Sequence, residues 1–250
     1  MHPRNKIEYV LFDMDGLLID SEKIYTIATN EVLAEYGKVM TWDIKAGCMG
    51  KPEIPAAQYL LSHFPDLPID IDTFLKERNR IQDTLWPTVP LLPGAKRLVQ
   101  HLKKHGIPIA VATSSRRRNF EMKSANLQDV FGLFEGKVIC GDDKQYNMRG
   151  KPEPDIFLTA AQVCLGREVG DPQSVPNEEQ LLEREKGLIF EDALPGMQAA
   201  RRSGMSVIWV PDSNLLNLGY GPVTERADQI LKSLEDFRPE EWGLPPFDDE

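Results

Sequence analysis

The sequence contains no apolar run that approaches the ~20 residues a helix needs to cross a bilayer, so a membrane partner is not expected. Positive charge is also scarce: 29 lysines and arginines stand against 39 aspartates and glutamates, which gives a formal net charge of -10. Nucleic-acid binding depends on lysine and arginine contacts to phosphate, so this balance disfavours nucleic acid as a partner. A small anionic substrate remains possible, because local cations and a bound metal can overrule the global charge at short range.

Cysteine is rare, with only Cys48, Cys140 and Cys164 in the chain. An odd number without CxxC spacing predicts neither a disulfide framework nor a zinc site. The first residues also lack the apolar segment of a secretory signal. We therefore expect a cytoplasmic protein, and a monomer as the simplest state.

Short apolar runs and amphipathic stretches alternate along most of the chain. The runs of strand length lack the alternation of a half-exposed strand, as expected for strands buried on both faces of a parallel sheet. They cover residues 7–12, 107–112, 137–140, 187–190 and 207–211. Between them, residues 95–104 and 155–165 have the spacing of helices. This order predicts an α/β protein with a Rossmann-like, doubly wound parallel sheet.

The alternation stops between residues 20 and 90, where residues 24–36 and 71–85 read as amphipathic helices and no strand is convincing. Prolines and a glycine within residues 86–94 end this segment. We therefore predict a catalytic core of residues 1–19 and 91–250 and a helical lobe of residues 20–90. Within the core, the acidic segment 166–186 is expected to be an exposed loop with one short helix, and the last six residues to be frayed.

Two carboxylates, Asp13 and Asp15, follow the first predicted strand and precede Gly16. Open α/β sheets place ligands at the carboxyl ends of their strands. Like charges this close are hard to ionise together, so the pair implies either a shared proton or a metal. The alternative is a polar strand-to-loop turn in which Gly16 supplies an unusual backbone angle.

Three further strand ends carry polar residues. Hydroxyls that could hold an anion follow the second strand, a lysine between a glycine and a proline follows the third, and two acids follow the fourth. These residues are Thr113, Ser114 and Ser115, then Lys151, then Glu191 and Asp192. Each has an ordinary explanation as a turn or surface residue. Their convergence on one edge of the sheet instead predicts phosphoryl transfer assisted by magnesium.

The segments DMDGLLIDS, ATSS, GKPEPDIF and FEDALPG occur in this order and resemble the four motifs of the haloacid dehalogenase-like phosphohydrolases. The resemblance extends over residues 7–244 and implies that residues 20–90 are a cap domain inserted after the first motif. Within the superfamily, residues 42–45, 49–51, 101–108 and 208–212 are most similar to the pseudouridine-5'-phosphate phosphatase group.

The resemblance implies a mechanism. Asp13 would attack phosphorus to form an aspartyl-phosphate, and Asp15 would protonate the leaving alcohol and then activate water. Lys151 would neutralise negative charge on the phosphate and on Asp13.

The resemblance also implies the binding residues. Mg²⁺ would be held by the Asp13 and Asp192 carboxylates and the Asp15 backbone carbonyl, with Glu191 as a direct or indirect ligand. Phosphate oxygens would be held by Thr113 and Ser114. Lys51, Ser115 and Arg116 would contact the rest of a small phosphorylated metabolite.

Other functions remain open at this point. A sugar-phosphate or glycerol-phosphate phosphatase would share these motifs and differ only in its cap contacts. A phosphosugar mutase is disfavoured, because those enzymes resemble this chain but have a histidine where Tyr25 stands. A non-catalytic binding protein is disfavoured because Asp13, Asp15 and Lys151 are all present.

Overall fold

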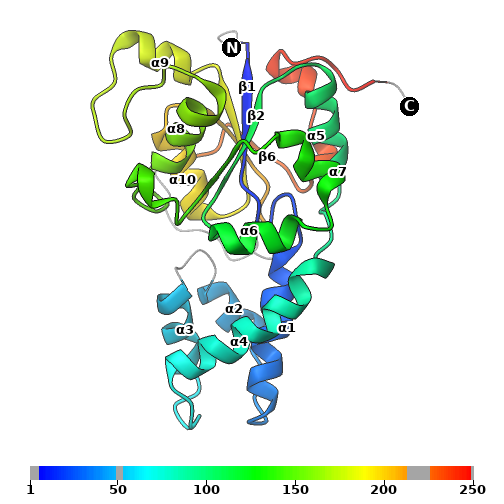
Figure 1. Ribbon diagram of the computed structural model, residues 1–250, viewed down its shortest axis with the longest axis vertical. Helices are drawn as coiled ribbons and strands as arrows, with labels where there is room; N and C mark the ends of the chain where they lie inside the picture. The colour runs from blue at the N-terminus through cyan, green and yellow to red at the C-terminus, as the bar shows by residue number, and fades with distance from the viewer. Residues whose placement is uncertain (1–5, 49–52, 213–225, 249–250) are drawn as a thin grey trace. The chain divides into compact units, whose positions relative to one another are not determined.

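The computed structural model describes residues 6–48, 53–212 and 226–248. The chain divides into two compact units, which are Met1–Ile19 with Leu91–Glu250 and Asp20–Pro90 (Figure 1). We refer to them as the core unit and the helical unit. Among the described helices, none has the length and apolar character required to span a membrane.

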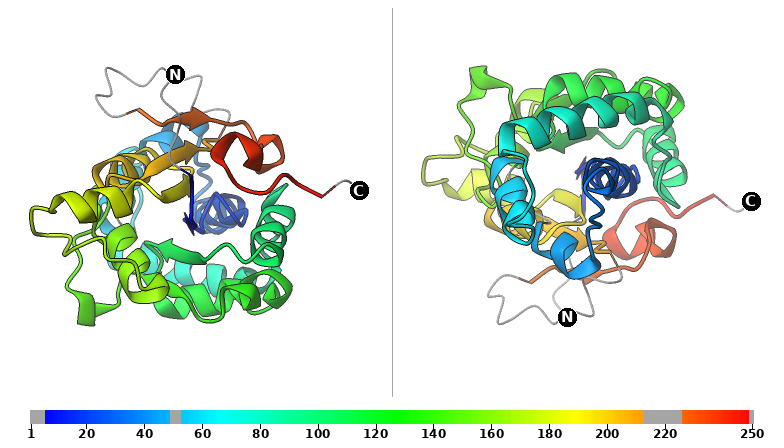
Figure 2. Two further views of the ribbon diagram at one scale, coloured as in Figure 1. Left: turned by 90° about the horizontal axis from the view of Figure 1, so that it is seen from above. Right: turned by 90° about the horizontal axis from the view of Figure 1, so that it is seen from below.

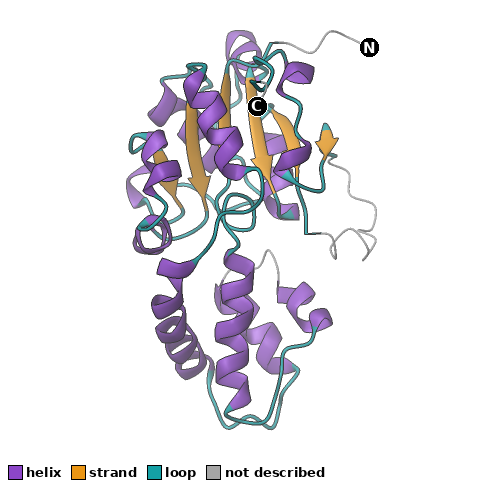
Figure 3. Cartoon of the chain, turned by 90° about the vertical axis from the view of Figure 1, so that its right-hand side faces the viewer, coloured by secondary structure: helices purple, strands orange, loops and turns teal. Residues whose placement is uncertain are grey.

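The core unit is built on a sheet of six parallel strands in the order β3-β2-β1-β4-β5-β6 (Figure 3). The strands are β1 (Tyr9–Phe12), β2 (Ile109–Thr113), β3 (Val138–Cys140), β4 (Gly187–Glu191), β5 (Ser206–Trp209) and β6 (Gln229–Ile230). The predicted α/β fold with a doubly wound parallel sheet is confirmed. Because Phe12 lies level with both Val111 and Phe190, the carboxyl ends of β1, β2 and β4 meet at one edge.

Helices cover both faces of this sheet, with α5 and α7 on one side and α8 and α10 on the other (Figure 1). The helices of the core unit are α5 (Ala95–Lys104), α6 (Arg117–Ser124), α7 (Gln128–Phe131), α8 (Asp155–Thr159), α9 (Glu178–Arg184) and α10 (Leu194–Arg202). Leu11 packs in the apolar cluster that includes Phe157 and Met197, whereas the neighbouring Phe12 stacks on Phe190 with ring centroids 5.2 Å apart. Every residue of β1 is buried, which explains why its sequence shows no alternation.

The helical unit contains α1 (Ser21–Ala34), α2 (Trp42–Cys48), α3 (Glu53–Ser62) and α4 (Ile71–Leu85). The side chains of Asp20 and Asp70 cap α1 and α4 by accepting hydrogen bonds from backbone N–H groups in the first turn. An apolar cluster that includes Val32, Leu60 and Phe74 joins the four helices. All residues of this cluster belong to the helical unit.

The structure differs from the sequence prediction in several elements, and helices α2 and α3 of the helical unit were not predicted. Strand β6 was not predicted, because two residues give no detectable pattern. The predicted helix at 155–165 is α-helical only to Thr159 and continues as a π-helix over Ala160–Cys164. The C-terminal residues 245–248 are not frayed but run beside α5 (Figure 2). There the Lys104 ammonium lies 2.8 Å from Oδ2 of Asp248.

Candidate active site

Strand β1 delivers Asp13 to the carboxyl edge of the sheet. The residue is 5% exposed, and its backbone N–H donates to the Phe190 carbonyl at 3.0 Å, which extends the pairing of β1 with β4. Directly after Asp15, the chain turns through Gly16 with φ of 77°. A Cβ at Gly16 would overlap a carboxylate oxygen of Asp192, so this glycine lets the first and fourth motifs approach closely.

Lys151 joins two buried carboxylates at this edge. Its ammonium lies 2.5 Å from Oδ1 of Asp13 and 2.6 Å from Oε1 of Glu191. The other Glu191 oxygen accepts a hydrogen bond of 2.8 Å from the Ala193 backbone N–H, just before α10. Both Glu191 oxygens are therefore engaged, which favours an indirect role for Glu191 at a metal site.

The charged groups alter one another's protonation. Burial raises the pKa of Asp13 to about 7; Lys151 opposes this change, whereas Glu191 and Asp15 add to it. Burial opposes the charge of Lys151, yet the Asp13 and Glu191 carboxylates hold the pKa of its ammonium above the usual value. Lys151 therefore keeps its positive charge, whereas Asp13, with a pKa of about 7, can be neutral or ionised near neutral pH.

The carboxylates of Asp13, Glu191 and Asp192 could hold a metal ion, because an oxygen from each lies within 4.8 Å of the others and all three residues are buried. Three carboxylates and one ammonium have a formal charge of -2 when ionised, which one divalent cation would balance. Hard oxygen donors of this kind suit Mg²⁺ or Ca²⁺ rather than softer metals. The donor set therefore fits the predicted magnesium ion.

Asp15 belongs to a second group of contacts. Its Oδ2 accepts hydrogen bonds from Ser115 Oγ at 2.7 Å and from Thr113 Oγ1 at 3.5 Å, and its Oδ1 lies 2.6 Å from the Lys123 ammonium. Lys123 was not predicted from the sequence. The polar sequence of α6, RRNFEMKS, gives no local signal that this lysine is buried.

The structure thus brings most of the predicted residues to one edge of the sheet, in two neighbouring groups. The first is Asp13, Lys151, Glu191 and Asp192; the second is Asp15, Thr113 and Ser115 with the added Lys123. Ser114 and Arg116 are exposed in the loop after β2. Lys51 lies outside the described residues, so its predicted contact with substrate stays a prediction.

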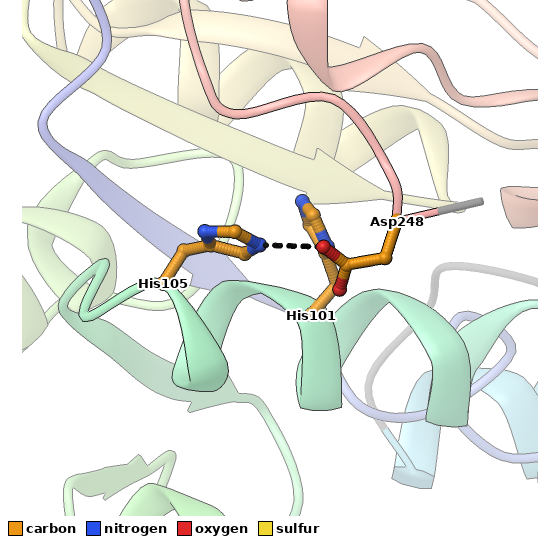
Figure 4. Close-up of side chains that lie close together, drawn as sticks. All are labelled: His101, His105 and Asp248. Carbon is orange, nitrogen blue, oxygen red and sulfur yellow. Dashed lines mark ion pairs between the residues drawn. The ribbon is translucent and has the colours of Figure 1, made fainter.

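Another group with suitable donor types, His101, His105 and Asp248, lies where the C-terminal segment meets α5 (Figure 4). Its atoms already have other partners: His101 Nε2 is 2.9 Å from the Pro245 carbonyl, and Asp248 lies 2.8 Å from the Lys104 ammonium and 3.5 Å from His105. The neighbouring ammonium disfavours a cation here. These contacts instead attach the C-terminal segment to the helix.

A parallel α/β sheet with buried carboxylates and a lysine at its carboxyl edge defines a class of enzyme that transfers phosphoryl groups. A family model described as haloacid dehalogenase-like hydrolase matches residues 10–210. The chain belongs to this family, which confirms the resemblance found in its motifs.

Relatives with assigned activities are similar over almost the whole chain. The chain is 43% identical to (DL)-glycerol-3-phosphatase 1, mitochondrial, of Arabidopsis thaliana, over 98% of this chain and 76% of that protein. It is 39% identical to a probable pseudouridine-5'-phosphatase of Drosophila melanogaster, over 98% of this chain and 97% of that protein. Both names support the predicted enzyme class, a phosphoric monoester hydrolase of this family, and that prediction is confirmed.

Solved structures share the fold. A haloacid dehalogenase family hydrolase from Deinococcus radiodurans R1 with bound phosphate and sodium superposes with a TM-score of 0.70 at 24% identity, covering 96% of this chain and 99% of that chain. At this identity the likeness concerns the arrangement of the chain alone. The fold described above is therefore shared with that solved structure.

Proposed function

We propose that this enzyme is a Mg²⁺-dependent phosphatase that hydrolyses small phosphate monoesters through an aspartyl-phosphate on Asp13. One observation carries the proposal: the buried Asp13 carboxylate lies 2.5 Å from the Lys151 ammonium, in a cluster with the Glu191 and Asp192 carboxylates. Burying a carboxylate costs free energy, and buried ionisable groups with perturbed pKa values cluster at functional sites. Attack on phosphorus is the chemistry that this charge serves.

In the first step, an Asp13 oxygen forms a bond to phosphorus while the bond from phosphorus to the ester oxygen breaks. The ester oxygen keeps the electron pair and takes a proton from Asp15, so the alcohol leaves neutral. Asp15 lies two residues beyond Asp13 and offers a carboxyl that is not paired with Lys151. The two aspartates thus divide nucleophilic and proton-transfer roles.

In the second step, Asp15 accepts a proton from a water molecule as the water oxygen bonds to phosphorus. The bond from phosphorus to Asp13 breaks, inorganic phosphate leaves, and both aspartates return to their starting state. Lys151 keeps its charge throughout, since the pKa of its ammonium is raised, and it stabilises negative charge on Asp13 and on the phosphoryl oxygens.

Asp13 and Asp192 are the side chains proposed to hold Mg²⁺, together with the Asp15 backbone carbonyl, and Glu191 supports them through Lys151. When bound, the ion would supply positive charge that favours the ionised form of Asp13 and neutralises negative charge on the phosphoryl group. Thr113 and Ser114 are proposed to hold phosphate oxygens. Residues 20–90 are proposed to act as the cap, with Lys51 and Arg116 in contact with the rest of the substrate.

Hydrolysis of p-nitrophenyl phosphate with Mg²⁺ tests the reaction class. Asp13→Asn should abolish turnover, whereas the exposed Asp171→Asn should keep it. Acid quenching during turnover should also yield a peptide containing Asp13 that is heavier by one phosphoryl group. Equal turnover by wild type and Asp13→Asn would refute the aspartyl-phosphate.

We propose pseudouridine 5'-phosphate as the substrate, with glycerol 3-phosphate as the second candidate. Each is supported by the name of a relative, the fly protein for the first and the Arabidopsis protein for the second. The comparison of kcat/KM for the two compounds decides between them. A value for pseudouridine 5'-phosphate no higher than that for glycerol 3-phosphate would reject the first candidate.

A cytoplasmic, monomeric state completes the proposal. All three cysteines are free, which suits a reducing compartment. Light scattering coupled to size-exclusion chromatography tests the monomer, and fractionation of cells that express the protein tests the location.

A further inference from the structure

Lys123 on α6 is a buried cation at the edge of the active site. The residue is 1% exposed, and its side chain has no exposed surface. Taking an ammonium out of water costs several kcal/mol unless charged and polar partners compensate. Two such partners are present: Nζ lies 2.6 Å from Oδ1 of Asp15 and 2.9 Å from Oγ of Ser115.

The two active-site aspartates therefore have separate lysines. Lys151 pairs with Asp13 and Glu191, whereas Lys123 pairs with Asp15. The two lysines come from different parts of the chain, the segment after β3 and helix α6. This division means that the orientation of Asp15 does not depend on the cation that serves Asp13.

The contacts of Asp15 distinguish its two oxygens. An ammonium has three donors and no acceptor, so the oxygen facing Lys123, Oδ1, is an acceptor whether Asp15 is ionised or neutral. The other oxygen, Oδ2, faces the hydroxyls of Ser115 and Thr113. Hydroxyls can accept as well as donate, so these two hydroxyls are compatible with a proton on Oδ2.

We propose that Lys123 is a positioning residue that, together with Ser115, fixes the Asp15 carboxyl and assigns the transferred proton to Oδ2. This inference rests on the proposed function, because Asp15 must be the acid that protonates the leaving alcohol. In the first step the proton on Oδ2 passes to the ester oxygen as its bond to phosphorus breaks, and Oδ1 keeps its contact with Lys123. Ser115 thereby acts on Asp15 rather than on the substrate.

Leaving groups that differ in their need for a proton test this role. Glycerol 3-phosphate releases a basic alkoxide that must be protonated, whereas p-nitrophenyl phosphate releases a stable phenolate that need not be. Lys123→Met should lower kcat/KM for glycerol 3-phosphate at least about 10-fold more than for p-nitrophenyl phosphate, because correctly placed acids contribute ~10²–10⁴-fold. A merely structural role would lower both values by the same factor.

Two further variants make the test robust. Ser115→Ala leaves Lys123 in place and should show the same selective loss, to a smaller extent, even if Lys123→Met does not fold. In an Asp15→Asn background, Lys123→Met should have no further selective effect, because the two residues act as one unit. Lys144→Met, an exposed lysine, is the control for loss of a charge.

The outcomes separate this inference from the proposed function. Equal losses on both substrates for Lys123→Met and Ser115→Ala, or no loss for either variant, would overturn the positioning role while leaving Asp13 as the nucleophile. Persistence of turnover in Asp13→Asn would instead refute the proposed function. Circular dichroism and the midpoint of urea unfolding verify that each variant is folded.

Discussion

The Lys151 ammonium lies 2.6 Å from Oε1 of Glu191, and the opposite oxygen of that carboxylate accepts from the backbone at the start of α10. Glu191 therefore fixes where the lysine charge sits as well as contributing to the negative potential of the site. The same ammonium reaches Asp13, so one lysine connects the ends of β1 and β4. A substitution at Asp13, Lys151 or Glu191 should therefore change the interactions of the other two residues.

Lys151→Met should both inactivate and destabilise the enzyme. Removing one partner of a buried ion pair leaves uncompensated charge and costs ~3–5 kcal/mol, and loss of a preorganised charge lowers kcat ~10²–10³-fold. Urea unfolding and steady-state kinetics measure the two effects, with the exposed Lys144→Met as control. Adding Asp13→Asn to Lys151→Met should recover part of the lost stability, and a further additive loss would contradict the pairing.

Gly196→Ala should disturb the same lysine indirectly. A Cβ at Gly196 would overlap Oε1 of Glu191, so the carboxylate must move away from Lys151. We expect at least about a 10-fold lower kcat and a loss of ~1–3 kcal/mol in the free energy of unfolding. Gly132→Ala is the matched control, because a Cβ there meets only a side-chain atom of Gln128 at 3.9 Å. Similar kinetics for both variants would show that the position of Glu191 is not critical.

Gly16→Ala should weaken the metal site. This glycine has φ of 77°, and a Cβ would overlap the Asp192 carboxylate, so the variant combines backbone strain with displacement of a proposed ligand. Gly37 is the matched control, because it has φ of 67° but a Cβ there would have no atom within 4 Å. Gly37→Ala therefore measures the backbone strain alone, which costs ~1 kcal/mol. Magnesium titration of activity should show a higher half-saturating concentration for Gly16→Ala alone. An unchanged half-saturating concentration of Mg²⁺ would show that Asp192 does not hold the metal.

The protonation of Asp13 predicts a pH dependence of stability. Its pKa is about 7 in the folded protein and 3.8 when unfolded, so between these values the folded state binds more protons and stability falls as pH rises. Asp13→Asn removes this effect. Its stability relative to wild type, measured by urea unfolding with EDTA, should therefore rise from pH 4 to pH 7 by on the order of 1–4 kcal/mol and then level off.

Magnesium should reduce that slope, because a cation favours the ionised form of Asp13. The same unfolding series with saturating Mg²⁺ checks this expectation. A stability difference between wild type and Asp13→Asn that is constant with pH would show that Asp13 is already ionised throughout this range.

The sequence alone predicted five of the six strands of the parallel sheet and most of the residues at its edge. Strands buried on both faces read as unbroken apolar runs, and polar residues such as Asp13 and Glu191 mark where each strand ends. Helix α4 was predicted with its observed bounds, because a capping Asp70 and a strong amphipathic pattern are local signals. The site was found because parallel strands bring their carboxyl ends to one edge.

Only the tertiary structure decided which charge meets which. Local patterns do not state that Lys151 joins Asp13 to Glu191, or that Lys123 lies in the interior and faces Asp15. Two of these three contacts link residues more than 100 positions apart, and all three depend on the register of the strands and the packing of α6. A lysine in a polar helix is exposed by default. Its burial here follows from the packing of Phe120 on Phe131, which turns that face of α6 inward.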